Sequence, residues 1–517
     1  MLFNSFAFIF CFLPLTAAGF FILGRWSRPA AAAWLLAASL AFYAWWDVRY
    51  LALLGGSILA NFRFGLALSD AHSAVREGRS RALLVLAVAV NLSVLGYYKY
   101  ANFFLGALAG ATGLHAQMAA VVLPLGISFF TFTQIAYLVD CSRGMVREAN
   151  LVHYALFVTY FPHLIAGPVL HHGEMMPQFA RPATYRPTAE NFAVGLTIFF
   201  VGLFKKVVIA DGIAPHVAPV FSAAAAGQTL TMLEANGGAL SYAFQLYFDF
   251  SGYSDMAIGL SRIFGITLPL NFNSPYKSVN IIDFWRRWHM TLSRFLRDYL
   301  YITMGGNRHG KVRRYLNLML TMVLGGLWHG AAWTFVVWGA IHGALLVLNH
   351  GWHSLKRRWM PNLPARMGQA LRPFSVLLTF YTVAVAWAFF RADSLDTAVA
   401  LVKAMAGCNG LDWPVEWKPA LQAALPWGVD AWQFRPASTF VAMPPLNWLT
   451  WLFAVVWLLP NTQQFMGRYS PALDAGDGDS SHPAWCPHPA WALAIAAIAL
   501  LAMMQMSHVS EFLYFQF

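Results

Sequence analysis

The stretch Tyr315–Asn349 reads YLNLMLTMVLGGLWHGAAWTFVVWGAIHGALLVLN and is almost entirely apolar. A helix rises about 1.5 Å per residue, so about 35 residues are long enough for two short membrane passes. The glycines within Gly325–Gly330 permit a sharp bend between the passes. Basic clusters flank both ends of the stretch (Lys311, Arg313 and Arg314; Lys356, Arg357 and Arg358). We therefore expect both outer ends in the cytoplasm and His329 deep in the membrane.

The composition of the whole chain extends this interpretation. Of 517 residues, 59% are hydrophobic and only 11% are charged, whereas soluble domains carry roughly 25% charged residues. The main solvent of the protein must therefore be a bilayer. The net charge of +12 does not indicate nucleic acid as a partner, because Lys and Arg gather in loops. The four cysteines are scattered and form no CxxC pair, so neither a zinc ribbon nor a disulfide framework is expected.

Apolar stretches recur along the chain and predict an all-α polytopic membrane protein with roughly 11–13 membrane segments, some of them re-entrant or tilted. The first stretch, Phe6–Leu23, has no basic residues before it, and we expect a membrane helix rather than a cleaved signal. The further stretches are 30–46, 50–69, 82–98, 121–139, 151–170, 192–213, 237–264, 312–328, 331–349, 374–390, 446–460 and 490–508.

Basic loops predict the orientation of the first half. They alternate with loops poor in basic residues up to about residue 150, which places the N-terminus outside. The basic loops contain Arg25 and Arg28, then Arg76, Arg79 and Arg81, then Arg143 and Arg147. The alternation then fails, and Phe161–Pro168, which contains His163, resembles a broken helix. Such a segment is tolerated at membrane depth only where protein or water lines it, so we expect it to be re-entrant.

Composition also divides the chain. Residues 1–406 form the predicted membrane core, and 407–445 form a Trp- and Pro-rich loop outside the membrane. Residues 446–517 form C-terminal membrane segments with a polar surface loop at 461–489, which contains the run Asp474–Ser481.

The stretch Ile281–Ile302 has apolar residues spaced by three and four, such as Trp285, Trp288 and Leu292, with basic residues on the other face. This pattern predicts an amphipathic helix lying on the membrane surface, followed by a Gly-rich basic loop at Gly305–Lys311.

The candidate for chemistry is His329. An ionisable residue inside a membrane is costly and is a functional candidate by default. Histidine also suits the transfer of a proton from a hydroxyl to a leaving group. From the residues alone, a core histidine bonded to a backbone carbonyl is an equally good interpretation.

Other polar residues lie in apolar surroundings. Gln245, Asp249 and Asp255 occur within 242–265, where they either line an aqueous path or join helices by hydrogen bonds, and His163 is a further candidate for such a polar path. His171, His172 and Glu174 are adjacent, but no second cluster has metal-ligand spacing, so no metal is expected. The sequence contains neither a G-x-S-x-G elbow nor a P-loop, which argues against a serine hydrolase and an ATP-driven pump.

Several motifs together resemble the bacterial membrane-bound O-acyltransferase family, and most closely the membrane subunit of alginate O-acetyltransferases. They are Asp283–Ser293, Leu296–Ile302, Gly305–His309, Gly325–Gly330, Gln245–Ala257 and Phe161–Val169. The likeness runs from Tyr43–Trp46 to about Arg391, and the remainder matches more loosely.

The resemblance implies a helical funnel that transfers an acyl group from a cytoplasmic donor toward an acceptor outside the inner membrane. The invariant histidine of the family falls on His329, and its second histidine motif falls on His289, whose role is either chemistry or shaping of the donor entrance. We expect Arg286, Arg287, Arg294, Arg308 and Lys311 to hold an anionic donor such as acetyl-CoA, with no bound cofactor. The expected partners are periplasmic SGNH-type acetyltransferases or the polymer itself.

Three other functions remain open at this point. One is transfer of D-alanyl or another acyl group to a different envelope polymer. A secondary transporter or flippase would have similar broken helices, but it predicts inverted repeats, which the sequence does not show. A purely structural export subunit predicts that His329 is dispensable.

Overall fold

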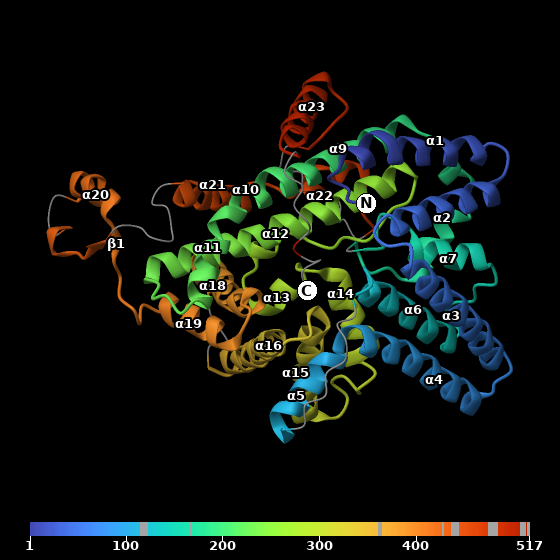
Figure 1. The fold of residues 1–517 in the computed structure, drawn as a ribbon, viewed down its shortest axis with the longest axis horizontal. Helices are drawn as coiled ribbons and strands as arrows, with labels where there is room; N and C mark the ends of the chain where they lie inside the picture. The colour runs from blue at the N-terminus through green and yellow to red at the C-terminus, as the bar shows by residue number, and fades with distance from the viewer. Residues whose placement is uncertain are drawn as a thin grey trace.

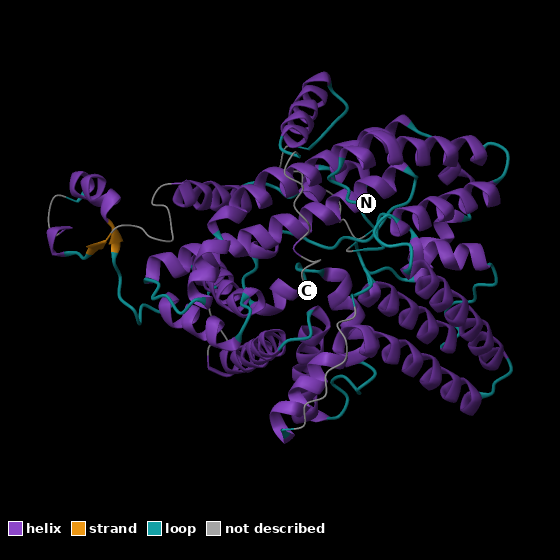
Figure 2. Cartoon of the chain, in the orientation of Figure 1, coloured by secondary structure: helices purple, strands orange, loops and turns teal. Residues whose placement is uncertain are grey.

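The computed structural model describes residues 1–113, 122–165, 167–359, 364–425, 429–435, 444–473, 484–506 and 513. The regular secondary structure of the described chain is almost entirely helical (Figure 2). The exception is a two-stranded parallel pair of β1 (Trp413–Pro414) and β2 (Phe434–Arg435). The predicted all-α class is therefore confirmed.

Twenty-three α-helices are assigned within the described residues. They are α1 (Leu13–Gly24), α2 (Arg28–Ala44), α3 (Tyr50–Ser73), α4 (Glu77–Leu95), α5 (Ala101–Thr112), α6 (Ile127–Ser142), α7 (Leu151–Thr159), α8 (His172–Phe179), α9 (Ala189–Phe204), α10 (Asp211–Ile213), α11 (Ala218–Ala225), α12 (Met232–Ile263), α13 (Ile281–Trp285), α14 (Met290–Phe295), α15 (Gly310–His329), α16 (Trp333–Trp359), α17 (Ala365–Ala370), α18 (Arg372–Arg391), α19 (Leu395–Met405), α20 (Lys418–Ala424), α21 (Pro444–Leu458), α22 (Thr462–Phe465) and α23 (Pro489–Met504).

Shorter helical turns join these helices. The π-helical turns are η1 (Phe8–Phe12), η2 (Gly96–Tyr100), η4 (Lys205–Ala210) and η7 (Leu296–Tyr301). The 3₁₀ turns are η3 (Pro182–Tyr185), η5 (Ala214–His216), η6 (Pro275–Lys277), η8 (Val415–Trp417), η9 (Val429–Ala431) and η10 (Gly467–Tyr469).

Within the part of the chain that the structure describes, five helical segments are long and apolar enough to cross a membrane, which makes this a multi-pass membrane protein. They are Tyr50–Ser73, Glu77–Thr112, Ala189–Ala225, Trp333–Trp359 and Arg372–Arg391, and three shorter apolar helices are Phe8–Gly24, Asn447–Leu458 and Pro489–Met504. Other predicted segments form shorter or interrupted helices such as α6 and α7, or the long buried helix α12.

Helix α12 runs through the middle of the molecule (Figure 1). Almost all of its residues are buried, and its two halves belong to two separate hydrophobic cores. Helix α9 lies along it at close range. A Cβ atom on Gly202 would lie 2.6 Å from the Gly252 carbonyl oxygen, and one on Gly259 would lie 2.5 Å from the Gly195 carbonyl oxygen. Only glycine permits two helix backbones to approach so closely.

The stretch Tyr315–Asn349 forms two packed helices, as predicted. Helix α15 ends at His329, and α16 begins at Trp333 after a short turn. Gly326 on α15 faces the backbone of Phe335 and Gly339 on α16, so a side chain at Gly326 would force the two helices apart. The turn and this glycine contact together fix where His329 lies.

The predicted single amphipathic helix over Ile281–Ile302 is wrong. The segment is divided into α13, α14 and η7, and the break falls at His289, whose φ is +43°. The helix is interrupted here because Asn271 forms hydrogen bonds with the residues that follow His289. Its carbonyl oxygen accepts from Met290 N at 2.9 Å, and its Oδ1 accepts from the Thr291 hydroxyl at 2.9 Å.

The described residues of 161–168 interrupt the helical structure, in agreement with the predicted broken helix, whereas the re-entrant path stays a prediction. Helix α7 ends at Thr159 and α8 begins at His172, and the described residues between them are almost all buried; Ala166 lies outside the described residues. A non-helical backbone at this depth is tolerated because protein surrounds it.

The predicted surface loop at 461–489 is wrong at its start. Helix α22 is packed inside the protein, where Thr462 and Gln463 are both about 4% exposed. Both donate hydrogen bonds to the Asp255 carboxylate, which accounts for the burial of two polar side chains. The run Asp474–Ser481 lies outside the described residues. The segment with β1, α20 and β2 lies apart from the main helical body (Figure 1).

Candidate active site at the end of helix α15

His329 lies at the C-terminal end of α15 inside a group of aromatic rings. Its side chain is buried, at 6% exposure. The ring centroids of Trp328, Trp338 and Phe390 lie 5.0, 5.2 and 5.1 Å from that of the imidazole, all in edge-to-face geometry. These rings come from α15, α16 and α18, so three helices close around one imidazole and keep bulk water away from it.

Three titratable groups lie near enough to affect His329 electrostatically: His289, Lys99 and His342. The sequence motifs indicated His289 but neither Lys99 nor His342. Lys99 is far from His329 in sequence, and His342 is one histidine within a long apolar helix, so only the packing of η2 and α16 against the end of α15 brings them to the site.

The tautomer of His289 follows from its neighbours. Its Nδ1 lies 3.1 Å from Asn271 Oδ1, which also accepts from the amide and the hydroxyl of Thr291. An amide oxygen cannot donate, so Nδ1 carries the proton and Nε2 has a free lone pair. Within the described part of the chain, this Nε2 is buried and has no hydrogen-bond partner. His289 thus offers a proton acceptor in a site closed to solvent.

His342 on α16 has the opposite arrangement. Its Nδ1 accepts a hydrogen bond from Trp285 Nε1 at 3.3 Å, so a neutral ring carries its proton on Nε2. The side chain is fully buried, and its Nε2 has no partner among the described residues. His342 therefore presents a buried N–H donor close to His329.

Comparison with known proteins places this site in a family. The family model "MBOAT, membrane-bound O-acyltransferase family" matches residues 144–385, which contain all three histidines. The chain is 44% identical over 438 residues to the peptidoglycan O-acetyltransferase of Helicobacter pylori, covering 80% of this chain and 81% of the relative. It is 43% identical over 410 residues to the probable alginate O-acetylase AlgI of Pseudomonas aeruginosa, covering 78% and 75%.

The chain belongs to the membrane-bound O-acyltransferase family. The family resemblance and the enzyme class predicted from the motifs are thereby confirmed. A more distant relative is the teichoic acid D-alanyltransferase of Bacillus subtilis, which is 31% identical over 249 residues, 46% of this chain and 62% of the relative.

The basic residues of this acyltransferase that were predicted to bind the donor fall into two groups. Arg287 pairs with Asp283 at 2.8 Å, and Arg294 forms a two-pronged pair with Glu174 at 2.6 and 2.9 Å. Arg286, Arg308 and Lys311 are exposed and make no ion pair with the described residues. These three are the members of the predicted set that are open to an anionic ligand.

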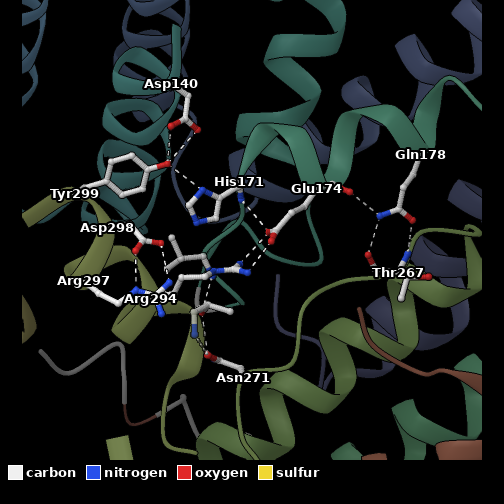
Figure 3. Close-up of polar contacts among 12 residues, drawn as sticks. Asp140, His171, Glu174, Gln178, Thr267, Asn271, Arg294, Arg297, Asp298 and Tyr299 are labelled. Carbon is white, nitrogen blue, oxygen red and sulfur yellow. Dashed lines mark hydrogen bonds and ion pairs between the residues drawn. The ribbon is translucent and has the colours of Figure 1, made fainter. Parts of the chain in front are cut away.

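The pair of Arg294 and Glu174 belongs to a larger polar network (Figure 3). Nearby, the Tyr299 hydroxyl lies 2.9 Å from both Asp140 Oδ1 and His171 Nδ1. These contacts join α14 and η7 to α6 and α8. The charge of Arg294 is therefore neutralised within the protein, and the arginine holds two helices together.

The predicted polar residues of the funnel lie at helix contacts. Asp249 pairs with Lys206 at 2.7 Å, and Asp255 pairs with Lys205 at 2.6 Å, so both carboxylates join α12 to η4. His163 Nε2 lies 2.9 Å from the Phe157 carbonyl oxygen, and Gln245 is only 8% exposed. For Asp249 and Asp255 this geometry favours the helix-joining interpretation over an aqueous path.

Among the described residues, no group of three or more His, Cys, Asp or Glu side chains is arranged to hold a metal ion. His171 and Glu174, which are adjacent to His172 in sequence, instead take part in the contacts of Figure 3.

Proposed function

We propose that this acyltransferase passes an acetyl group from cytoplasmic acetyl-CoA across the bacterial inner membrane for O-acetylation of an exopolysaccharide, with alginate as the first candidate. The observation that carries the proposal is the position of His329, which lies buried at a helix end among aromatic rings beside two further histidines. The relatives named as O-acetyltransferases support the choice of an acetyl group.

In the proposed reaction, the neutral imidazole of His329 accepts the proton of an acceptor hydroxyl. The hydroxyl oxygen attacks the thioester carbonyl carbon, the carbon–sulfur bond breaks, and the thiolate takes the proton back from His329. The acetyl group is then bound to the acceptor oxygen as an ester, and the reaction requires no metal. The free Nε2 lone pair of His289 supports a second proton-accepting role for that residue.

Arg286, Arg308 and Lys311 are the proposed contacts for the phosphates of the donor. They are exposed and unpaired among the described residues, and guanidinium groups bind phosphate in two-pronged geometry. Arg287 and Arg294 are proposed to act indirectly, by holding the local backbone through their carboxylate partners. The proposed acceptor side is periplasmic, with SGNH-type acetyltransferases or the polymer itself receiving the acetyl group.

Peptidoglycan is the second candidate acceptor, because the relative named for that activity shares 44% identity over most of both chains. Transfer of D-alanine is less well supported, because the relatives named for it match only 52% and 46% of this chain.

The decisive experiment replaces His329 with alanine and compares it with His353→Ala, an exposed histidine on α16. Each variant is expressed in an alginate-producing host that lacks its own membrane O-acetylase but retains the periplasmic partners. Ester-linked acetate on alginate and on peptidoglycan is measured per amount of folded membrane protein.

We expect the unchanged chain and His353→Ala to restore acetate on alginate, and His329→Ala to lower it by about 100-fold or more. Full acetylation by His329→Ala would overturn the catalytic role. Acetate found on peptidoglycan alone would identify peptidoglycan, and not alginate, as the acceptor.

A further inference from the structure

We propose that Lys99 is a positioning residue, which caps the C-terminal end of α15 from a neighbouring helix and thereby holds the His329 imidazole in place. The inference rests on the proposed role of His329. Lys99 lies outside the motifs that resemble the family and outside residues 144–385, which the family model matches.

The contacts of Lys99 account for all three protons of its ammonium group. Nζ donates to the carbonyl oxygens of Trp328 and His329 at 2.7 and 3.1 Å, and to Ser128 Oγ at 3.3 Å. The hydroxyl of Tyr100 donates to the Leu327 carbonyl oxygen at 3.0 Å. Two consecutive residues therefore bind the last three carbonyl groups of α15.

Helix α15 needs such a partner because its own chain does not close its end. Its C-cap residue, Gly330, is extended with φ −160° and ψ 151°, and no backbone N–H of the cap folds back onto the helix. The last carbonyls of a helix lack partners within the helix and carry its partial negative charge. In apolar surroundings, leaving them unpaired costs free energy, and a cation at this end is favourable.

The geometry of η2 explains how Lys99 and Tyr100 reach the same target. They lie in a π-helical turn, Gly96–Tyr100, between α4 and α5. A π-turn inserts one extra residue and rotates the side chains that follow, and such turns are frequent at functional sites. Among the described residues, Lys99 has no carboxylate partner, and the carbonyl groups at the end of α15 are its nearest acceptors.

The link to function is the carbonyl of His329 itself. A residue at the end of a helix is where fraying begins, and a bond to its own carbonyl restrains the backbone that carries the imidazole. Misplacing a catalytic group by about 1 Å can cost about 100-fold in rate. Lys99 therefore acts on turnover through the orientation of His329, without contact with the acyl group.

The test uses the full-length protein in lipid nanodiscs, with acetyl-CoA and the acceptor found to be acetylated. Four chains are compared: the unchanged protein, Lys99→Met, Lys99→Arg and the matched control Lys277→Met. Lys277 also donates to a carbonyl beyond the end of a helix, Leu459 O at 2.7 Å after α21, and this helix is not the one that carries His329. kcat, KM for acetyl-CoA, and amide hydrogen exchange of the peptide covering 327–335 are measured.

We expect Lys99→Met to lower kcat by about tenfold or more with KM unchanged, and to speed hydrogen exchange in 327–335. Lys99→Arg should recover most of the kcat, because a guanidinium also donates to carbonyls, and Lys277→Met should leave both readouts unchanged. An unchanged kcat in Lys99→Met, or an equal loss in Lys277→Met, would overturn the proposal.

The two proposals fail in different ways. If His329→Ala is fully active in the same assay, the proposed function falls. Hydrogen exchange then still tests whether Lys99 holds the end of α15. Unchanged exchange of 327–335 in Lys99→Met would show that Lys99 does not cap the helix.

Discussion

At the scale of the residue, the site is defined by which nitrogen of each histidine is already occupied. Asn271 Oδ1 accepts a hydrogen bond from Nδ1 of His289. Trp285 Nε1 instead donates a hydrogen bond to Nδ1 of His342. The two rings therefore present a lone pair and an N–H, respectively. This difference favours proton transfer over substrate guidance for His289, which the sequence alone left undecided.

The prediction at this scale concerns His289. We expect His289→Asn to lower kcat by about 100-fold with KM for acetyl-CoA unchanged, because the asparagine amide keeps a donor at the place of Nδ1 for Asn271 but has no basic nitrogen. Steady-state kinetics on purified protein measure both parameters. A higher KM with normal kcat would instead assign His289 to the donor entrance.

At the scale of the element, glycines decide which helices carry the site. Gly326 and Gly339 let α15 and α16 touch backbone to backbone, and this contact determines how close the His329 end lies to Trp338. The neighbouring Gly325 is different, because a Cβ there would meet only the tip of the Leu296 side chain, at 3.1 Å. Adjacent glycines on one helix thus have unequal structural roles.

The prediction at this scale compares Gly326→Ala with its matched control Gly325→Ala. The methyl at 326 would overlap the backbone of α16, and forcing extra atoms into a packed interior costs about 1–3 kcal/mol. We expect Gly326→Ala to lower both the thermal midpoint in detergent and the acetyltransferase rate, while Gly325→Ala stays near the unchanged protein. Equal thermal midpoints and equal rates for the two variants would mean that α15 and α16 can move apart without loss of stability or activity.

At the scale of the whole molecule, the sequence predicts those features of the fold that depend on composition and on the spacing of apolar residues. The apolar run around His329 predicted two packed helices, because length and glycine placement are local properties. Lys99 and His342 escaped prediction because their partners are far along the chain. The break at His289 also escaped, since the apolar spacing of Ile281–Ile302 suits a helix and only the distant Asn271 interrupts it. Contacts between segments that are far apart in the chain cannot be predicted from one sequence.

Whole-molecule stability also depends on buried ion pairs that join helices. Lys206 is 1% exposed and binds both Asp249 and Asp211 at 2.7 Å, while the amide of Leu513 donates to the other Asp249 oxygen at 3.2 Å. These bonds connect η4, α12 and a residue near the end of the chain. The same carboxylate was a candidate for an aqueous path, so its two possible roles can be separated by experiment.

Removing Lys206 leaves two carboxylates without their cation, and breaking a buried pair costs about 3–5 kcal/mol. We expect Lys206→Met to lower the thermal midpoint strongly, and Lys206→Met with Asp249→Leu to recover part of the loss, because that variant no longer buries the Asp249 charge. Arg297→Ala, which removes a more exposed pair with Asp298, is the control and should change the midpoint little. If Asp249 only joins helices, the double variant keeps its kcat per folded molecule. A stable double variant with lost turnover would instead place Asp249 on the path of the reaction.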